Sequence, residues 1–365
     1  MINMKQKKRC IYLSVLYILI ILSVSTGCQS HLNKDTTQDH QYMDGKLLLT
    51  SNVSYPHLSA PVNISDYVLQ VAMIESSSPE LYRENEHIYT AINNWINNLL
   101  DFDEFHKVGL NSYGMIGQDG YGNVHFTGYY TPVIKARHTP TAEFKYPIYK
   151  MPNLNEGEFP SREQIYNGAL AGKGLEIAYS NSLMDNFIME VQGSAYIDFE
   201  DGDPLVFFSY AGKNGYSYSS IGQLLVKQGE IKKEELSMQA IKDWSKNKNE
   251  EKLKQLLIQN RSFVFFEPKY NAEVKGAASV PLIANASVAS DKSLIPIGSV
   301  ILADVPLLDD DGQHRGRRET RLMVALDVGG AIKGQHFDLY LGIGEKPGEL
   351  AGFYNHYGRV WVLKP

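Results

Sequence analysis

Cysteine is nearly absent from this chain of 365 residues, which contains only Cys10 and Cys28. Cys10 lies in a segment that we expect to be removed from the mature protein, so that Cys28 would remain alone. No disulfide is then possible, even in an oxidising compartment. The folded part also has no thiol for cysteine catalysis or for a cysteine-ligated metal site.

Positive charge is in slight deficit, with 35 lysines and arginines against 41 aspartates and glutamates. The formal net charge is -6, and loss of the four cations near the N-terminus described below would take it to about -10. No basic stripe with interleaved aromatic residues occurs. This charge balance argues against nucleic acid as a partner.

Sequence motifs for metals and phosphates are missing as well. His125, His336 and His356 lack the spacing of metal ligands, and no HExxH motif occurs. The glycine-rich residues 117–122 lack the lysine and the strand–helix context of a phosphate loop. We therefore expect no metal ion and no other cofactor.

One long apolar run is present, from Ile11 to Val24. It spans about fourteen residues, whereas a membrane-spanning helix needs about twenty. Cations precede it at Lys5, Lys7, Lys8 and Arg9, and small residues follow it. Residues 1–27 are therefore predicted to be a signal peptide.

The segment Ser25-Thr26-Gly27-Cys28 resembles the lipobox of bacterial lipoproteins, in which the cysteine is lipidated and becomes the first residue. Leucine is usual at the position of Ser25, and ordinary signal cleavage or an uncleaved anchor remain the alternatives. Gln29, rather than aspartate, follows the cysteine, which favours the outer membrane. We expect a palmitate-type anchor on Cys28 at the periplasmic face of that membrane, followed by a polar, flexible tether over residues 28–45.

Tyrosine is in excess, with 23 tyrosines against 14 phenylalanines. A flat apolar ring with a polar hydroxyl suits a groove that holds sugars. A tyrosine-rich sheet protein would have the same composition. Trp95, Trp244 and Trp361 are predicted to be core residues rather than sugar platforms.

The strongest helix signal is Ser78 as the N-cap with Pro79 in the first helical position. Apolar residues then recur at helical spacing, namely Ile88, Ile92, Trp95 and Leu99. Ser161 and Gln164 form a capping-box pattern. Further elements predicted in the middle third are helices over 237–244 and 250–258 and strands over 187–191 and 205–210. This mixture indicates a small second domain.

Residues 124–132 have the composition of a strand, with Gly128 at the centre. A glycine there often marks close approach by a ligand or by another backbone. From Val274 onward the pattern is almost entirely β, with strands expected over 299–305, 321–328, 337–341 and 359–363. Short, regularly spaced strands favour a barrel.

The densest group of candidate catalytic residues lies between two of these strands. Asp327 ends one apolar strand and Asp338 begins the next, with three glycines and Lys333 between them. An acid placed where a strand meets a glycine-rich loop is partly buried yet reachable. Partial burial raises the pKa of a carboxyl group, as a general acid requires. The pattern alone also fits two aspartates that cap turns, and it does not choose between the two.

This segment resembles the C-terminal three-aspartate domain of the membrane-bound lytic murein transglycosylase A family, with Asp291 matching the third aspartate. Other stretches are similar to the family, namely Phe126–Tyr130, Val191–Ser194, Tyr210–Gly215 with Ser220–Gly222, and Gly276–Leu282. The matches keep the family's order and spacing from about residue 78 to the C-terminus.

The resemblance implies a mainly β fold with α. A double-psi β-barrel domain would be formed by residues 46–132 and 271–365, and a smaller α+β domain would be inserted over residues 133–270. A glycan groove would lie between them. The implied reaction cleaves the β-1,4 bond between N-acetylmuramic acid and N-acetylglucosamine in peptidoglycan and leaves a 1,6-anhydromuramic end.

On this resemblance Asp338 is the catalytic acid and base, and Asp327 is a neighbour that helps to keep it protonated. One carboxyl group suffices because the sugar's own C6 hydroxyl attacks, whereas most glycosidases need two. The candidate glycan contacts are Thr127, Tyr129, Gln192, Ser194, Tyr210 and Lys333. Asp291 is expected to brace a turn.

Two other functions stay open. An inverting murein hydrolase would use Asp338 as the acid and Asp327 as the base, with the carboxyl groups about 6.5–9.5 Å apart. A non-enzymatic lipoprotein would bind peptidoglycan without cleaving it. The expected partners are peptidoglycan strands, a membrane reached through the lipid anchor, and cell-wall synthesis machinery.

Overall fold

The computed structural model describes residues 59–98, 102–120, 122–153, 159–202, 205–309 and 312–365, and two short strands before them. These strands, β1 (Tyr42–Met43) and β2 (Lys46–Leu47), pair antiparallel. The end of the predicted tether therefore includes a strand. The predicted signal peptide, Cys28 and the rest of the tether lie outside the described residues.

Two helices precede the main sheet, α2 (Ile64–Ser77) and α3 (Pro79–Asn97). The start of α3 is as predicted, although the Ser78 side chain makes no capping hydrogen bond. Its apolar face is buried, and Trp95 is fully enclosed. The sequence analysis missed α2. A 3-10 helix, η1 (Phe102–Val108), follows α3, and Phe105 packs edge-on against Trp95 with 4.6 Å between ring centroids.

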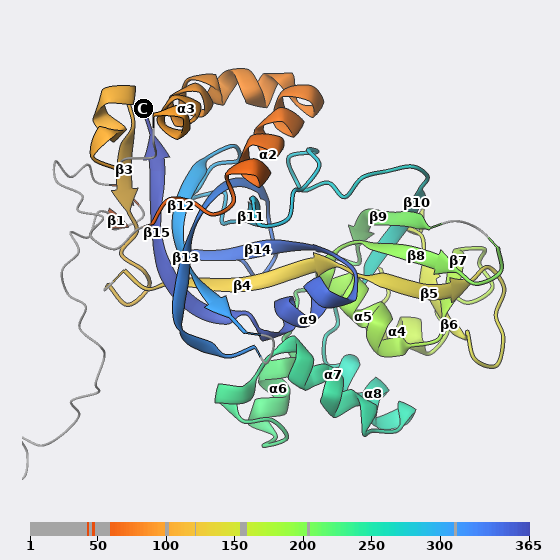
Figure 1. The fold of residues 1–365 in the computed structure, drawn as a ribbon. Helices are drawn as coiled ribbons and strands as arrows, with labels where there is room; N and C mark the ends of the chain where they lie inside the picture. Colours follow the sequence, from red (N-terminus) through yellow and green to blue (C-terminus); the bar gives the residue numbers. More distant parts are fainter. Residues whose placement is uncertain are drawn as a thin grey trace, which may run out of the picture. The chain divides into compact units, whose positions relative to one another are not determined.

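Seven strands form the larger sheet, in the order β12-β13-β11-β14-β4-β15-β3. Their bounds are β3 (Asn111–Gly114), β4 (Val124–Thr131), β11 (Ser287–Ala289), β12 (Val300–Leu308), β13 (His314–Asp327), β14 (His336–Ile343) and β15 (Asn355–Lys364). β12 pairs with β13 on one side and with β15 on the other, so six of these strands close into a ring (Figure 1). The four strands predicted in the C-terminal part are present, each longer than expected.

Pleating puts alternate residues of each strand inside and outside this ring, and the inner side chains are apolar. Phe126, Phe337 and Ile301 are fully buried members of that core. Helix α9 (Glu345–Phe353), which the sequence analysis missed, crosses β4. A Cβ on Gly128 would lie 3.1 Å from the Cα of Ala351 in α9. Gly128 therefore marks close approach by another backbone.

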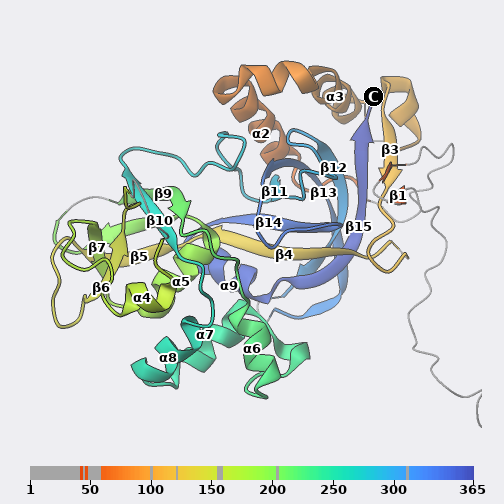
Figure 2. The same cartoon turned by 180° about the vertical axis from the view of Figure 1, so that it is seen from behind.

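The second sheet has six strands in the order β10-β9-β8-β5-β7-β6 (Figure 2). Their bounds are β5 (Val133–Arg137), β6 (Tyr146–Tyr149), β7 (Glu176–Ser180), β8 (Ala195–Phe199), β9 (Val206–Lys213) and β10 (Val264–Lys269). β4 leads into β5 through Pro132 alone, so the two sheets are joined by one nearly continuous stretch of chain. β10 is the last strand of this sheet along the chain, and β11 of the larger sheet follows it.

Five helices and a 3-10 turn accompany the second sheet: α4 (Arg162–Tyr166), α5 (Leu183–Gln192), α6 (Ile221–Lys227), η2 (Lys233–Glu235), α7 (Met238–Lys246) and α8 (Glu250–Leu257). Both hydrogen bonds of the capping box predicted at Ser161 and Gln164 are present. The strand predicted over 187–191 is wrong, because these residues belong to α5. Most residues of α5 are buried, so apolar residues occur on several of its faces and show no helical periodicity in the sequence.

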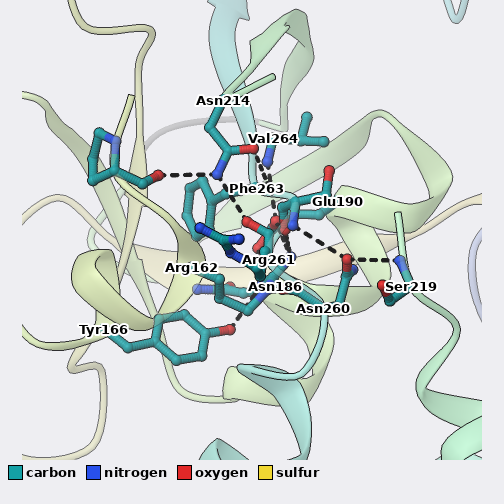
Figure 3. A network of polar contacts seen from close by, with 12 residues as sticks. Arg162, Tyr166, Asn186, Glu190, Asn214, Ser219, Asn260, Arg261, Phe263 and Val264 are labelled. Carbon is teal, nitrogen blue, oxygen red and sulfur yellow. Dashed lines mark hydrogen bonds and ion pairs between the residues drawn. The ribbon is translucent and has the colours of Figure 1, made fainter. Parts of the chain in front are cut away.

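A buried ion pair holds α4 and α5 together (Figure 3). Arg162 Nη2 donates to Glu190 Oε2 at 2.8 Å, and both side chains are buried. Arg162 also donates to the Tyr166 hydroxyl and to the carbonyl oxygen of Asn260. Because every charged atom is partnered, the pair fixes α5 against the loop that precedes β10.

None of the helices within the described residues is long and apolar enough to cross a membrane.

Candidate active site

Five neighbouring strands of the barrel carry one row of side chains. Ala289 of β11 pairs with Asp338 of β14 on one side and, beyond a bulge, with Asp327 of β13 on the other. Thr127 of β4 pairs with Asp338, and Asn355 of β15 pairs with Thr127. Residues directly opposite one another project from the same face of a sheet. The row therefore brings the two predicted acids and Thr127 to one face.

Asp338 is the half-buried centre of this row. The Thr127 hydroxyl donates a hydrogen bond to its Oδ1 at 2.6 Å. Burial raises the pKa of Asp338 to about 7, the hydrogen bond from Thr127 opposes that rise, and the charge of Asp327 adds to it. A carboxyl group with a pKa near neutrality can both give and take a proton at physiological pH.

Asp327 is held differently. Its Oδ1 accepts hydrogen bonds from the backbone N–H groups of Ala277 and Val328, each at 2.9 Å, and its Oδ2 accepts one from the Tyr129 hydroxyl at 3.0 Å. Burial raises the pKa of Asp327, but all three of these bonds lower it. The carboxylate oxygens are thus already engaged by the protein.

A second row lies two residues away on the same face. His336 of β14 pairs with His125 of β4, which pairs with Tyr357 of β15. The imidazole rings stack with centroids 4.3 Å apart, and His125 stacks on Tyr357 at 5.2 Å. His336 Nε2 lies 2.9 Å from the Thr127 hydroxyl oxygen. Burial, followed by the charge of His125, lowers the pKa of His336 to about 4.

The remaining predicted glycan contacts occupy separate positions. Tyr210 of β9 is exposed over 51% of its surface, and Lys333 is exposed in the loop between β13 and β14. Ser194 is half-buried between α5 and β8. Gln192 ends α5, and its Oε1 accepts a hydrogen bond from the backbone N–H of Tyr130 at 3.0 Å.

Asp291 braces a turn, as expected from the sequence. Its Oδ1 accepts hydrogen bonds from the backbone N–H and the hydroxyl of Ser293, and its Oδ2 accepts one from the N–H of Gly334. The last bond fixes the glycine-rich loop just before β14. Asp291 therefore helps to position the strand that carries Asp338.

The sequence analysis missed four residues of this face, His125, His336, Asn355 and Tyr357. The two histidines were considered only as metal ligands, and Asn355 and Tyr357 were not considered. The signal for His336 was its separation of two residues from Asp338 in a predicted strand region, since that spacing puts both side chains on one face. Within the residues that the structure describes, no group of three or more His, Cys, Asp or Glu side chains is placed to hold a metal ion.

Comparison with known proteins places these features in a family. Residues 125–267 match the family model of the MltA specific insert domain, and residues 286–364 match that of the 3D domain. The membrane-bound lytic murein transglycosylase A of Escherichia coli K12 is 54% identical over 354 residues, which cover 96% of each chain. The chain belongs to this transglycosylase family.

Other members agree with that assignment. The membrane-bound lytic murein transglycosylase A of Vibrio cholerae is 41% identical over 94% of this chain and 93% of its own. The crystal structure of E. coli MltA with bound chitohexaose superimposes with a TM-score of 0.82 at 55% identity, covering 90% of this chain and 98% of that one. The predicted fold class, a barrel with an inserted α+β domain, is confirmed.

Proposed function

We propose that this chain cleaves the glycan strands of peptidoglycan as a lytic transglycosylase, with Asp338 as its only acid and base. Membership of the family supports the reaction class, and the relative bound to chitohexaose supports a glycan ligand. The observation that carries the assignment to Asp338 is its half-buried carboxyl group, whose pKa is raised to about 7.

The proposed bond is the β-1,4 link between N-acetylmuramic acid and N-acetylglucosamine. Asp338 donates its proton to the glycosidic oxygen as the C1–O bond breaks. The C6 hydroxyl of the same muramic acid residue then attacks C1, and the Asp338 carboxylate removes the hydroxyl proton. The products are a new N-acetylglucosamine hydroxyl and a 1,6-anhydromuramic end, and Asp338 is protonated again. Intramolecular attack replaces the second carboxylate of most glycosidases.

Asp327 fits a supporting role better than that of a base. Its Cα is two strand spacings from that of Asp338, about 10 Å, so the backbone separation does not exclude an inverting pair. Three hydrogen bonds from the protein stabilise the ionised form of this carboxylate, however, so they lower its basicity and leave at most one lone pair of Oδ2 for a water. These contacts count against the inverting hydrolase. The charge of Asp327 instead favours the protonated form of Asp338.

We also propose Tyr210, Ser194 and Lys333 as glycan contacts, because their exposed or half-buried side chains remain accessible. The hydroxyl of Tyr129 and the Oε1 of Gln192 are engaged with other parts of the protein. These two residues would support the site rather than bind sugar through those atoms.

The proposed domain division is a barrel of residues 46–132 and 271–365 with residues 133–270 inserted, and a glycan groove between the two. A signal peptide over residues 1–27 and a lipid on Cys28 would attach the protein to the periplasmic face of the outer membrane. Metabolic labelling with an alkyne palmitate tests the anchor, since Cys28→Ala should abolish labelling. Interaction with cell-wall synthesis machinery is testable by crosslinking in cells.

Digestion of purified murein sacculi in water enriched in oxygen-18 tests the reaction. The expected soluble products carry 1,6-anhydromuramic ends without oxygen-18, and Asp338→Ala should bind sacculi while releasing none. Reducing muramic ends that carry oxygen-18 would overturn transglycosylation in favour of hydrolysis. Binding by the wild-type protein without any soluble product would favour the non-enzymatic alternative.

A further inference from the structure

A chain of three side chains leads away from the proposed catalytic carboxyl group. Asp338 Oδ1 lies 2.6 Å from the Thr127 hydroxyl oxygen, which lies 2.9 Å from His336 Nε2. All three side chains project from one face, because Asp338 pairs with Thr127 and His336 precedes Asp338 by two residues. The mechanism above uses only the first of them.

The hydrogen atoms along this chain can be assigned by counting. Thr127 has one hydroxyl hydrogen, and it is donated to Asp338 Oδ1. The contact with His336 Nε2 must then use a hydrogen on the nitrogen. The neutral imidazole therefore carries its hydrogen on Nε2, and the order of donation is His336 to Thr127 to Asp338.

The opposite order would harm the reaction. If His336 Nε2 lacked a hydrogen, the Thr127 hydroxyl would donate to it, and the Thr127 oxygen would then accept from Asp338. The acidic proton would then lie on Oδ1 and would be donated to Thr127 instead of to the substrate. When His336 donates to Thr127 and Thr127 donates to Asp338, Oδ1 accepts, so the proton of the neutral acid resides on Oδ2, where it is available to the glycosidic oxygen.

We propose that His336 is a positioning residue, which, through Thr127, places the acidic proton of Asp338 on Oδ2. This inference rests on the proposed function of Asp338 and extends it to a residue that does not touch the substrate. The same bond from Thr127 then stabilises the carboxylate that remains after the proton has left, and Oδ2 is free to receive the proton of the C6 hydroxyl.

The surroundings of His336 keep this arrangement constant with pH. His125 of β4 stacks on the ring at 4.3 Å, and Tyr357 of β15 stacks on His125. The carboxyl groups that face this region are Asp338 on the same strand and Asp327 on β13, which is held by its own three bonds. Burial keeps His336 neutral above about pH 4. Protonation below that pH would leave the Nε2 hydrogen in place.

Four variants test the proposal on purified sacculi. His336→Phe keeps a ring for stacking but removes the donor, and we expect kcat to fall about tenfold with little change in KM. His336→Gln retains an N–H donor and should recover most of the rate. Thr127→Val should lower kcat at least as much, whereas Thr127→Ser keeps the hydroxyl and should remain close to the wild type.

The decisive measurement is the double variant Thr127→Val/His336→Phe. If His336 acts through Thr127, adding His336→Phe to Thr127→Val should lower kcat by less than twofold. A full tenfold further loss, or a His336→Gln variant as slow as His336→Phe, would overturn the proposal. The control variant is His356→Phe. His356 pairs with Phe126 and therefore projects from the other face of the barrel, so this variant should leave kcat unchanged.

The pH profile adds a readout that misfolding would not mimic. The Thr127 bond lowers the pKa of Asp338, so Thr127→Val should move the high-pH fall in activity to higher pH. A high-pH fall in activity at the same pH as in the wild type would contradict the proposed hydrogen bond. Failure of the proposed function would give a different result. If the wild-type protein forms no anhydromuramic ends, the proposed reaction is wrong, whatever the variants show.

Discussion

The side chain of Gln192, the last residue of α5, accepts a hydrogen bond from the backbone N–H of Tyr130 in β4. Tyr130 lies three residues beyond Thr127 on the strand that passes from the barrel to the second sheet. Tyr130 is buried, so its N–H has little access to water as a substitute partner. The bond therefore links α5, which packs with the second sheet, to β4, the barrel strand that carries Thr127.

Replacement of Gln192 by Leu should lower the free energy of unfolding by about 1–2 kcal/mol, because a largely buried N–H loses its partner. Gln192→Glu keeps an acceptor oxygen and should be less destabilised. Urea unfolding followed by tryptophan fluorescence measures both. Equal destabilisation of the two variants would show that the acceptor is unimportant.

The Arg162–Glu190 pair should respond strongly to loss of one partner. Arg162→Met leaves a buried carboxylate without its counter-charge, and a loss of about 3–5 kcal/mol in the free energy of unfolding is expected. The double variant Arg162→Met/Glu190→Gln removes that charge and keeps an acceptor for the N–H of Val264. It should recover part of the loss, and a double variant less stable than Arg162→Met would contradict this account.

Activity should depend on pH through Asp338. The reaction begins with the protonated acid, and the pKa of Asp338 is raised by burial to about 7. The rate of sacculus solubilisation should therefore decline as the pH rises through about 7. Initial rates between pH 5 and pH 9 check this, and a rate that rises steadily to pH 9 would exclude Asp338 as the acid.

Stability should depend on pH through the same group, and it should fall in the same direction as activity. When the pKa of a carboxyl group is higher in the folded state than in the unfolded state, the free energy of unfolding of the protein falls as the pH rises from about 4 to about 7. Asp338→Asn should therefore raise the free energy of unfolding by about 2 kcal/mol at pH 8, with a smaller gain at pH 5. Denaturant titrations at the two pH values make the comparison.

Asp291 provides a control of opposite sign. The hydroxyl of Ser293, followed by the N–H of Gly334, lowers the pKa of Asp291. Its contribution to stability is present above the unfolded-state pKa and is lost as the pH falls through the lower folded-state value. Asp291→Asn should therefore destabilise the protein at pH 8. An increase in stability for both variants would indicate a general charge effect instead.

Much of the barrel could be predicted from the sequence because its strands alternate with turns rich in glycine and proline. The inserted region was harder. The run Phe187–Val191 was predicted as a strand, but contacts on most sides bury α5 and remove the polar face that reveals a surface helix. The capping box at Ser161 was predicted correctly because its two residues lie only three positions apart in the sequence.

The site was predictable only in part. Asp327 and Asp338 stood out by their places at strand ends, but composition did not choose between them, and family resemblance did. The choice has a physical basis in the hydrogen bonds from Ala277 and Val328, which fix Asp327 alone. The Thr127–Asp338 bond joins residues 211 positions apart, and no local pattern carries that information.

The closed ring of strands has a consequence for when the enzyme becomes active. β4 enters the ring between β14 and β15, and β12 and β15 complete it. During synthesis from the N-terminus, Thr127 is made more than 200 residues before Asp338, and the last strand of the ring, β15, follows later still. The loop-closure entropy of contacts with such long sequence separation slows folding. The proposed site therefore cannot form before β14 has been synthesised, and the protein is inactive until then.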